Sequence, residues 1–274
     1  MLFGFITEGA TDQAVLKNIL YGLFDTDDID FTSLAPLLDE TGKSTVKTRA
    51  GWQRALEFCS SAKFEDTLAF VDYLIIQIDT DVSEEKGFDI CHTYFDEQNQ
   101  RHEEKNTEQL ILEVVEFLKK KISLDIYRDY KDQIIFAVSV HSIECWLLPI
   151  LFPSDSPTDQ KKRQKRKNCF NSITTRLKKS SIKTCDPELD LWIKKAKQPI
   201  VKDKKETEVY RQLSNPFVKR LLLFQAIPKN ESLCHFISYL LEAIEEKDFD
   251  PEMSKLRNEI ELQFQELPKS LEED

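Results

Sequence analysis

The stretches LFGFITEGATD at residues 2–12 and YLIIQIDTD at residues 73–81 decide the fold. Each is an apolar run of strand length that ends in acidic residues. The run at 73–78 is typical of a central parallel strand that is buried on both faces. After the first run, Thr11 is placed to cap a helix whose apolar face lies within residues 15–23. The chain is therefore predicted to open with a strand, a turn and a helix.

The same alternation continues to about residue 152. We predict further helices over 48–60, 108–122 and 142–152, a third strong strand over 134–140 and a weaker strand near 30–38. Ser142 is placed to cap the last of these helices, and the polar, acidic stretch 83–107 predicts a loop or insertion. Alternating strands and helices indicate a parallel sheet with right-handed crossovers.

The rest of the chain has a different composition. No glycine follows Gly87, which favours helices, and two are predicted over 231–246 and 251–266. We therefore predict an α/β fold, with a parallel sheet flanked by helices over residues 1–152. Residues 153–274 form a basic segment followed by a mainly helical C-terminal region.

The composition of the 274 residues excludes several classes of protein. The six cysteines contain no CxxC pair and the four histidines are dispersed, so neither a disulfide framework nor a zinc site is indicated. We expect a reducing compartment. The start of the chain lacks a basic leader, and no apolar run approaches the roughly 20 residues that span a bilayer. A cytoplasmic protein without a membrane partner is predicted.

A net charge of −11 would argue against a nucleic-acid partner if the charge were evenly spread. Between residues 161 and 183, however, there are ten basic residues and no acidic one. Such a segment can guide a polyanion, although a solvated linker is an equal alternative. It lacks the interleaved aromatic residues of a single-strand stacking platform. The candidate nucleic-acid contacts are Lys161, Lys162, Arg163, Lys165, Arg166, Lys167, Arg176, Lys178 and Lys179.

Acidic residues follow each of the three strong strands. Glu8 follows the first, Asp79 and Asp81 follow the second, and Glu144 lies in the helix after the third. In an open parallel sheet, ligands bind at the carboxyl ends of the strands. Asp12, four residues beyond Glu8, is placed to face the same crevice. Magnesium prefers oxygen ligands, so these five acids are the predicted metal ligands.

Plainer interpretations of the same residues remain open. An acid in the first turn of a helix is favoured by the helix dipole, which accounts for Asp12 and Glu144 without a metal. Asp79 and Asp81 can simply end a strand and cap a turn. His141 can contact a phosphate, or it can be a hydrogen-bonded structural histidine.

The quoted motifs together resemble the TOPRIM domain, a Rossmann-like domain shared by topoisomerases, primases and OLD-family nucleases. Glu8-Gly9-Ala10-Thr11-Asp12 has the EGxxD form of the first motif, and IDTD at 78–81 has the form of the second. The segments HSIECWLL at 141–148 and NESLCHFISYLL at 230–241 look most like OLD-type and RloB-like bacterial proteins of anti-phage and abortive-infection modules. The resemblance covers residues 1–152 well and the remainder loosely.

The resemblance implies a metal-dependent nuclease. Glu8 would act as general acid/base or metal ligand, Asp79 and Asp81 would bind Mg²⁺ or Mn²⁺, and Asp12 would join them. Two metals would clamp the scissile phosphate of DNA or RNA. OLD nucleases carry an ATPase on the same chain, and none is found here, so a separately encoded ABC/OLD-like ATPase partner is implied. A homo-oligomer is also possible.

This sequence departs from other TOPRIM proteins and leaves two rival functions open. Position 83 is serine rather than a third acid, which argues against a topoisomerase, and no primase zinc module is present. The IIQIDTDVS stretch also resembles an aspartyl-phosphate phosphohydrolase, in which Asp79 would be the nucleophile and Asp81 the acid. The third possibility is a non-catalytic regulatory subunit of an ATPase complex.

Overall fold

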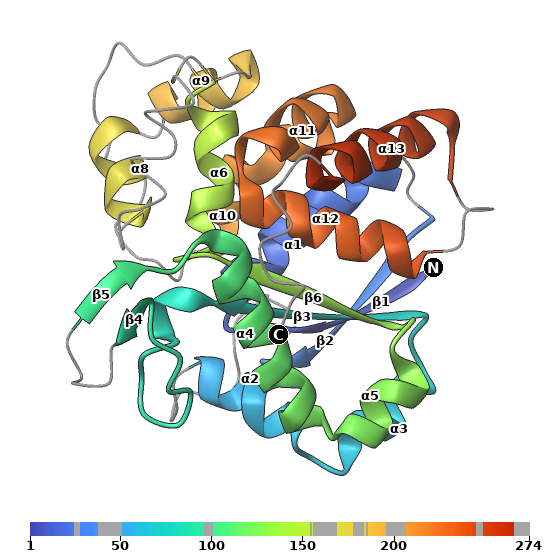
Figure 1. Ribbon diagram of the computed structural model, residues 1–274. Helices are drawn as coiled ribbons and strands as arrows, with labels where there is room; N and C mark the ends of the chain where they lie inside the picture. The colour runs from blue at the N-terminus through green and yellow to red at the C-terminus, as the bar shows by residue number, and fades with distance from the viewer. Residues whose placement is uncertain are drawn as a thin grey trace.

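A four-stranded parallel sheet lies at the centre of the protein, with helices on both faces (Figure 1). The computed structural model describes residues 1–24, 28–37, 51–95, 101–153, 155, 169–177, 184, 186–195, 207–244 and 249–265. Within these residues, the predicted α/β architecture is confirmed.

The sheet has the strand order β2-β1-β3-β6, and every pair of neighbours is parallel. The strands are β1 (Leu2–Ile6), β2 (Asp30–Ala35), β3 (Tyr73–Asp79) and β6 (Ile134–Ser139). The two quoted stretches form the central strands β1 and β3, and the strand expected only weakly near 30–38 is the edge strand β2. The carboxyl ends of β1, β3 and β6 therefore meet at one end of the sheet.

The helices account for most of the remaining described residues. They are α1 (Ala10–Phe24), α2 (Gly51–Cys59), α3 (Lys63–Leu68), α4 (Thr107–Ile122), α5 (Leu124–Tyr130), α6 (Glu144–Leu151), α8 (Cys169–Leu177), α9 (Pro187–Lys195), α10 (Thr207–Ser214), α11 (Arg220–Ala226), α12 (Glu231–Ala243) and α13 (Pro251–Gln265). Short 3₁₀ turns are η1 (Thr80–Val82), η2 (Asn215–Val218) and η3 (Ile227–Lys229).

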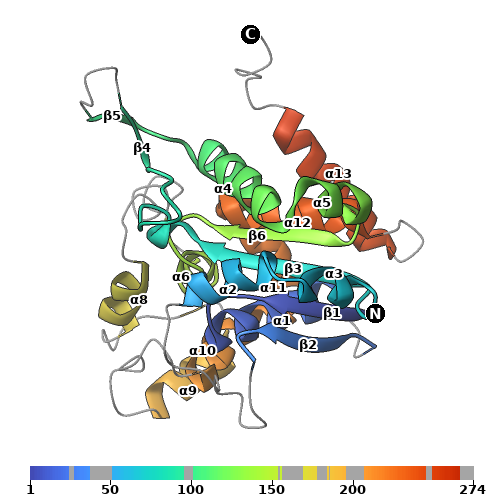
Figure 2. The same ribbon diagram turned by 90° about the horizontal axis from the view of Figure 1, so that it is seen from below.

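The two faces of the sheet bury separate groups of apolar side chains, because successive residues of a strand point to opposite faces. On β3, Ile75 faces the layer of α1, α6 and the C-terminal helices, whereas Leu74 and Ile76 face α2 to α5. Figure 2 shows α2 and α3 in front of the sheet, with α4 and α5 beside β6. The protein is thus a three-layer sandwich with the sheet in the middle.

The hydrophobic core runs across the boundary predicted at residue 152. Phe5 of β1 and Ile135 of β6 share one apolar cluster with residues of α8, α10, α12 and α13. Helix α10 packs against α1, and α12 packs along β6, an edge strand of the sheet (Figure 1). The helical C-terminal region therefore forms the outer layer on one face of the sheet.

Several local predictions are corrected by the structure. Helix α1 begins at Ala10, one residue before the predicted cap Thr11, and α6 begins at Glu144 without a side-chain cap from Ser142. The predicted loop over 83–107 contains an antiparallel pair, β4 (Thr93–Phe95) and β5 (Arg101–Glu104). These strands are too short to show a hydrophobic period, and the pattern missed α3 and α5 for the same reason.

No helix within the described residues combines the length and the apolar character needed to cross a membrane.

The contact between α1 and η2 leaves no room for a side chain at Gly22. A Cβ atom on Gly22 would lie 1.8 Å from the carbonyl oxygen of Phe217. Because that oxygen belongs to the backbone, the two segments would have to separate. We expect Gly22→Ala to lower the free energy of unfolding by about 3 kcal/mol, at the upper end of the range for overpacking. Urea denaturation measures this loss. The exposed Lys120→Ala is the control and should change stability by less than about 0.5 kcal/mol; equal stabilities of the two variants would contradict the close packing.

Candidate functional site

The acids that follow β1 and β3 lie in direct contact. Oε1 of Glu8 accepts a hydrogen bond from the backbone N–H of Asp79 at 2.8 Å. Gln77 links the same two residues, because its Oε1 accepts from Glu8 N at 3.4 Å and its Nε2 donates to Asp79 Oδ1 at 2.7 Å. The prediction that Glu8 and Asp79 come together is confirmed.

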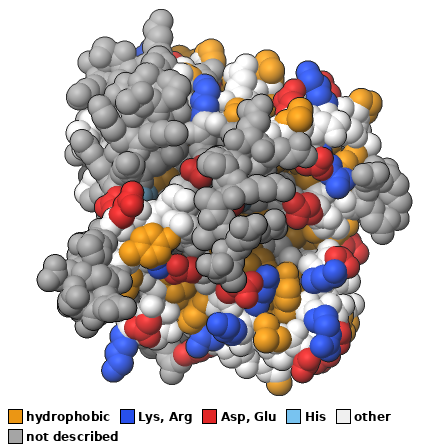
Figure 3. Space-filling model, viewed as in Figure 1, with side chains coloured by type: hydrophobic (Ala, Val, Ile, Leu, Met, Phe, Trp, Pro, Cys, Tyr) orange, Lys and Arg blue, Asp and Glu red, His pale blue; other side chains and the backbone are white. Residues whose placement is uncertain are grey.

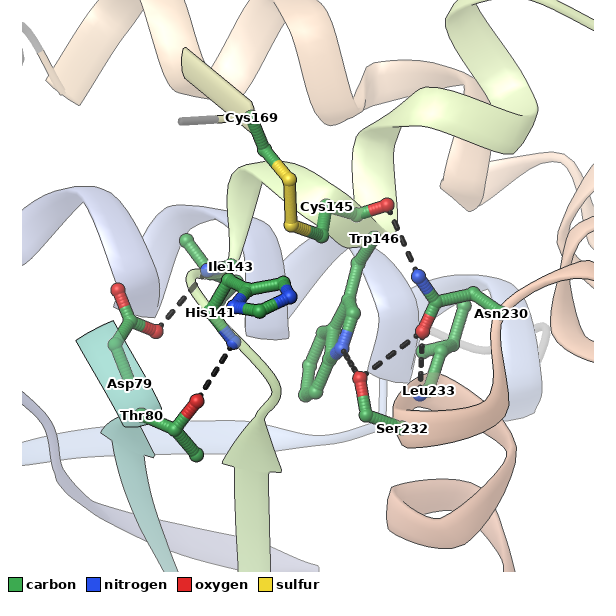
Figure 4. Close-up of a disulfide and its surroundings, with 10 residues drawn as sticks. All are labelled: Asp79, Thr80, His141, Ile143, Cys145, Trp146, Cys169, Asn230, Ser232 and Leu233. Atoms are coloured by element: carbon green, nitrogen blue, oxygen red, sulfur yellow. Dashed lines mark hydrogen bonds between the residues drawn. A yellow bond between two sulfur atoms is a disulfide. The ribbon is translucent and has the colours of Figure 1, made fainter. Parts of the chain in front are cut away.

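The carboxylate of Asp79 is fixed through one oxygen. In addition to Gln77, the backbone N–H of Ile143 donates to Oδ1 at 3.0 Å, as Figure 4 shows. Ile143 is the residue before α6, so the amino end of that helix points at the carboxylate, where a negative charge is favoured. The hydrogen bonds that the described residues make to this carboxylate all go to Oδ1.

Asp12 is held by the turn between β1 and α1. Its Oδ2 accepts from Gly9 N at 2.6 Å, and the Thr7 hydroxyl donates to Gly9 O at 2.9 Å. The Asp12 side chain is buried. The turn is also packed from outside, because a Cβ on Gly51, the first residue of α2, would lie 2.1 Å from Glu8 O. Any side chain at position 51 would therefore displace Glu8.

Glu144 has a partner that the sequence did not reveal. The hydroxyl of Tyr210, on α10, donates to Glu144 Oε1 at 2.5 Å. Both side chains are buried, with exposed fractions of 5% for Glu144 and 2% for Tyr210. Burial, followed by Glu144, Asp12 and Asp79, raises the pKa of Tyr210, so its hydroxyl stays protonated. In the sequence, a tyrosine within a short polar helix gives no sign of this role.

A buried polar network fixes helix α6, which carries Glu144. Asn230 Nδ2 donates to Cys145 O at 3.1 Å, and Trp146 Nε1 donates to Ser232 Oγ at 2.9 Å. Ser232 in turn donates to Asn230 Oδ1 at 3.0 Å, so the three side chains form one connected group (Figure 4). The start of α12 therefore sets the position of the first turn of α6.

A disulfide bond joins Cys145 of α6 to Cys169 of α8. The expectation of a chain without disulfides is therefore wrong, and the argument for a reducing compartment loses its basis. The two Cα atoms lie 5.3 Å apart, although the cysteines are 24 positions apart in the sequence. Spacing along the chain carries no information on such an approach in space. Among the described residues, Cys59, Cys91 and Cys234 are free thiols.

Thr80, between the two aspartates, binds the turn that precedes α6. Its hydroxyl accepts from His141 N at 2.7 Å, and His141 O accepts from Asp81 N at 2.8 Å. His141 has a φ of 70°, an uncommon conformation for a residue with a side chain. Its ring stacks on that of His92, with centroids 5.6 Å apart, and His92 Nε2 hydrogen-bonds Thr80 O at 2.6 Å. These contacts involve the backbone of His141 and the face of its ring, so both interpretations of its side chain stay predictions.

Four acids act together on the carboxyl group of Asp79. Burial raises the pKa of Asp79 well above its ordinary value, and Glu8, Asp12, Asp81 and Glu144 raise it further, in that order. We call these five residues the carboxylate cluster. Each of these causes acts in the same direction, because each disfavours a further negative charge. The acids that follow the three strong strands thus all act electrostatically on Asp79.

The carboxylate cluster is not arranged as a ready-formed metal centre. In the part of the chain that the structure describes, no three His, Cys, Asp or Glu side chains are placed so that they could hold a metal ion. Glu8 Oε1, Asp79 Oδ1 and Glu144 Oε1 each accept a hydrogen bond from a protein donor, and both oxygens of Asp12 do so, from Gly9 N and from the Thr11 hydroxyl. The acids are therefore near one another, but each is oriented by the protein.

Of the nine predicted nucleic-acid contacts, Arg176 alone lies within the described residues. Its guanidinium donates to both carboxylate oxygens of Asp155, at 2.6 and 3.0 Å, and stacks on the ring of Phe152. On the face drawn in Figure 3, Lys and Arg side chains of described residues are interspersed with Asp and Glu. The eight that lie outside the described residues are Lys161, Lys162, Arg163, Lys165, Arg166, Lys167, Lys178 and Lys179.

Comparisons with models of protein families, with curated proteins and with solved structures found no match to this chain. The resemblance to TOPRIM proteins therefore stays a prediction that rests on the motifs. What the structure establishes is the α/β fold with a four-stranded parallel sheet and the contact of Glu8 with Asp79 at its carboxyl end.

The raised pKa of Asp79 predicts that this residue destabilises the folded protein at neutral pH. Folded Asp79 holds its proton more tightly than unfolded Asp79, so stability falls as the pH rises from about 4 through the raised pKa. In Asp79→Asn, the amide oxygen can still accept from Ile143 and Gln77. We expect this variant to melt at a higher temperature than the wild type at pH 8 in EDTA.

The difference in melting temperature between Asp79→Asn and the wild type should shrink as the pH is lowered. It should vanish below about pH 4, where Asp79 is protonated in both the folded and the unfolded protein. Scanning calorimetry between pH 4 and pH 8 measures both melting temperatures. A wild type that is more stable than the variant at pH 8, or a difference that does not depend on pH, would show that the repulsion is absent.

Proposed function

We propose that this chain is a nuclease that hydrolyses phosphodiester bonds with Mg²⁺ or Mn²⁺ bound at the carboxylate cluster. The observation that carries the proposal is the electrostatic environment of Asp79, whose carboxyl group meets four further acids from different parts of the chain. A divalent cation removes this repulsion, and carboxylate oxygens are the ligands that Mg²⁺ prefers. The cluster lies at the carboxyl end of a parallel sheet, where ligands of such sheets bind.

The donor set of the cluster fits a divalent cation. Asp79 and Glu144 each have one oxygen held by protein donors, which leaves Asp79 Oδ2 and Glu144 Oε2 for an ion. Glu8, Asp12 and Asp81 supply the remaining carboxylates. Because the side chains do not converge as they stand, the proposal requires them to turn toward one another when the ion binds.

The chemistry would be divided between the ion and the chain. When bound, divalent cations polarise the attacking water and stabilise the leaving oxygen. The backbone N–H groups of Gly9, Asp79 and Ile143 and the Tyr210 hydroxyl orient the carboxylates. Donors of this kind, which bind a metal ligand without touching the metal, limit how far each carboxylate can turn when the ion binds.

The substrate and the partner belong to the same proposal and rest on the sequence. The basic segment over 161–183 would contact the phosphate backbone of DNA or RNA, and this contact should weaken as the salt concentration rises. A separately encoded ATPase and a toxic role in bacterial anti-phage defence rest on the resemblance to OLD-type and RloB-like proteins alone.

The rival phosphohydrolase uses the same aspartate differently. There, Asp79 would be phosphorylated, and the single charge of its carboxylate would be replaced by the roughly two negative charges of an acyl phosphate beside four other acids. In the nuclease, Asp79 binds a cation and the repulsion falls. The electrostatics of the cluster therefore favour the nuclease. Beryllofluoride that bound to Asp79 and inhibited hydrolysis of p-nitrophenyl phosphate would favour the rival.

The experiment compares the wild type with Asp79→Asn on supercoiled plasmid and on total RNA, each with Mg²⁺ or Mn²⁺. We expect the wild type to cleave one of them and EDTA to stop it. Removal of a residue that only hydrogen-bonds a metal ligand typically lowers activity by roughly 10- to 100-fold. Because Asp79 is proposed to be a ligand itself, Asp79→Asn should lose more activity than that. The control is Asp125→Asn on the exposed surface of α5, which should cleave like the wild type.

The calorimetry described above shows whether Asp79→Asn is folded, and a folded but inactive variant excludes unfolding as the cause of its inactivity. Equal inactivity of both proteins, alone and with any ATPase that co-purifies, would contradict the nuclease and favour the non-catalytic subunit. Cleavage by Asp79→Asn at the wild-type rate would exclude the carboxylate cluster as the site.

A further inference from the structure

We infer that Tyr210 is a positioning residue for Glu144, which it holds through Oε1 so that only Oε2 remains for a divalent cation. This inference rests on the proposed function, and it adds a residue of the C-terminal helices to the site. Neither the motifs nor the resemblance points to Tyr210.

The contact between the two side chains is buried and specific. Among the described residues, the bond from the Tyr210 hydroxyl to Oε1 is the single hydrogen bond of the Glu144 carboxylate. Both side chains are more than nine-tenths buried. A buried carboxylate that loses its one donor is left without a partner, which costs more than the bond itself contributes to stability. Tyr210 therefore determines how Glu144 lies.

Helix α10 is fixed against α1, which carries Asp12. Asn18 of α1 donates to Arg211 O at 3.0 Å and to Ser214 Oγ at 2.8 Å. Ser214 in turn donates to Tyr210 O at 2.7 Å. These bonds set the position of Tyr210 relative to the start of α1.

The Tyr210 hydroxyl also lies among the other acids. Asp12 and Asp79 both act on it electrostatically, in addition to Glu144. A single hydroxyl from α10 is thus close to carboxylates that follow all three strong strands.

The chemical nature of the donor suits a cation site. A lysine or arginine at this position would also hold Glu144, but its charge would repel a divalent cation nearby. A phenol donates a hydrogen bond without a charge, so it can orient the carboxylate and leave its negative charge to the ion. Residues that hydrogen-bond a metal ligand without touching the metal commonly influence metal affinity.

The test is a double-mutant cycle on the full chain, read by calorimetric titration with Mn²⁺. The variants are Tyr210→Phe, Glu144→Gln and the two combined. Tyr210→Phe removes one oxygen atom, and we expect it to weaken Mn²⁺ binding by about 10- to 100-fold. In the Glu144→Gln background it should have no further effect, because the group that it positions is already changed. In the cleavage assay, Tyr210→Phe should raise the Mn²⁺ concentration that gives half the maximal rate.

The matched control is Tyr239→Phe on α12. Tyr239 is a partly buried tyrosine of the same core, and its hydroxyl makes no hydrogen bond within the described residues. Its Mn²⁺ affinity should equal that of the wild type. An equal loss in Tyr239→Phe and Tyr210→Phe would show a general packing effect and would overturn the inference.

Other outcomes separate this inference from the proposed function. If the wild type binds Mn²⁺ and Tyr210→Phe binds it equally well, or if the effects of Tyr210→Phe and Glu144→Gln simply add, Tyr210 does not position Glu144 and the nuclease proposal stands. If the wild type neither binds Mn²⁺ nor cleaves nucleic acid, alone and with any ATPase that co-purifies, both fail. Should circular dichroism show that Tyr210→Phe does not fold, Asn18→Ala replaces it. We expect Asn18→Ala to weaken Mn²⁺ binding, and an unchanged affinity would overturn the inference.

Discussion

The parallel pairing of β1 with β3 and of β3 with β6 is the constraint on which the rest of the structure depends. Parallel strands bring their carboxyl ends to the same edge, so whatever follows each strand must share one small region. The chain places acids there three times. The bond from Asp79 N to Glu8 Oε1 crosses between the two central strands and is the most direct sign of this arrangement.

Such a gathering of acids opposes folding, and the donors that orient these acids are neutral. The orienting groups named above are backbone N–H groups, an amide and a phenol, none of which carries a charge. Charge-neutral donors hold the carboxylates in place and leave their mutual repulsion in force. Residues that reduce stability in this way are typical of functional sites, where a ligand supplies what the fold lacks.

Sequence patterns predicted the features that depend on neighbours along the chain. The strands β1, β3 and β6 and the position of Glu8 beside Asp79 follow from apolar runs and from the rule for parallel sheets. Tyr210 could not be found in this way, because its partner Glu144 lies 66 positions away and α10 is short and polar. The Cys145–Cys169 bond escaped prediction for the same reason: it depends on how α8 packs, which no local pattern encodes.

The continuity of the core across residue 152 limits how the chain can be divided. Phe5, Ile75 and Ile135 lie on the face of the sheet that α10, α12 and α13 help to cover. A fragment that stopped at residue 152 would expose this apolar face to water and would also lack the donor for Glu144. Such an uncovered surface promotes association with other molecules. The two halves of the sequence are therefore expected to fold as one cooperative unit and to unfold together.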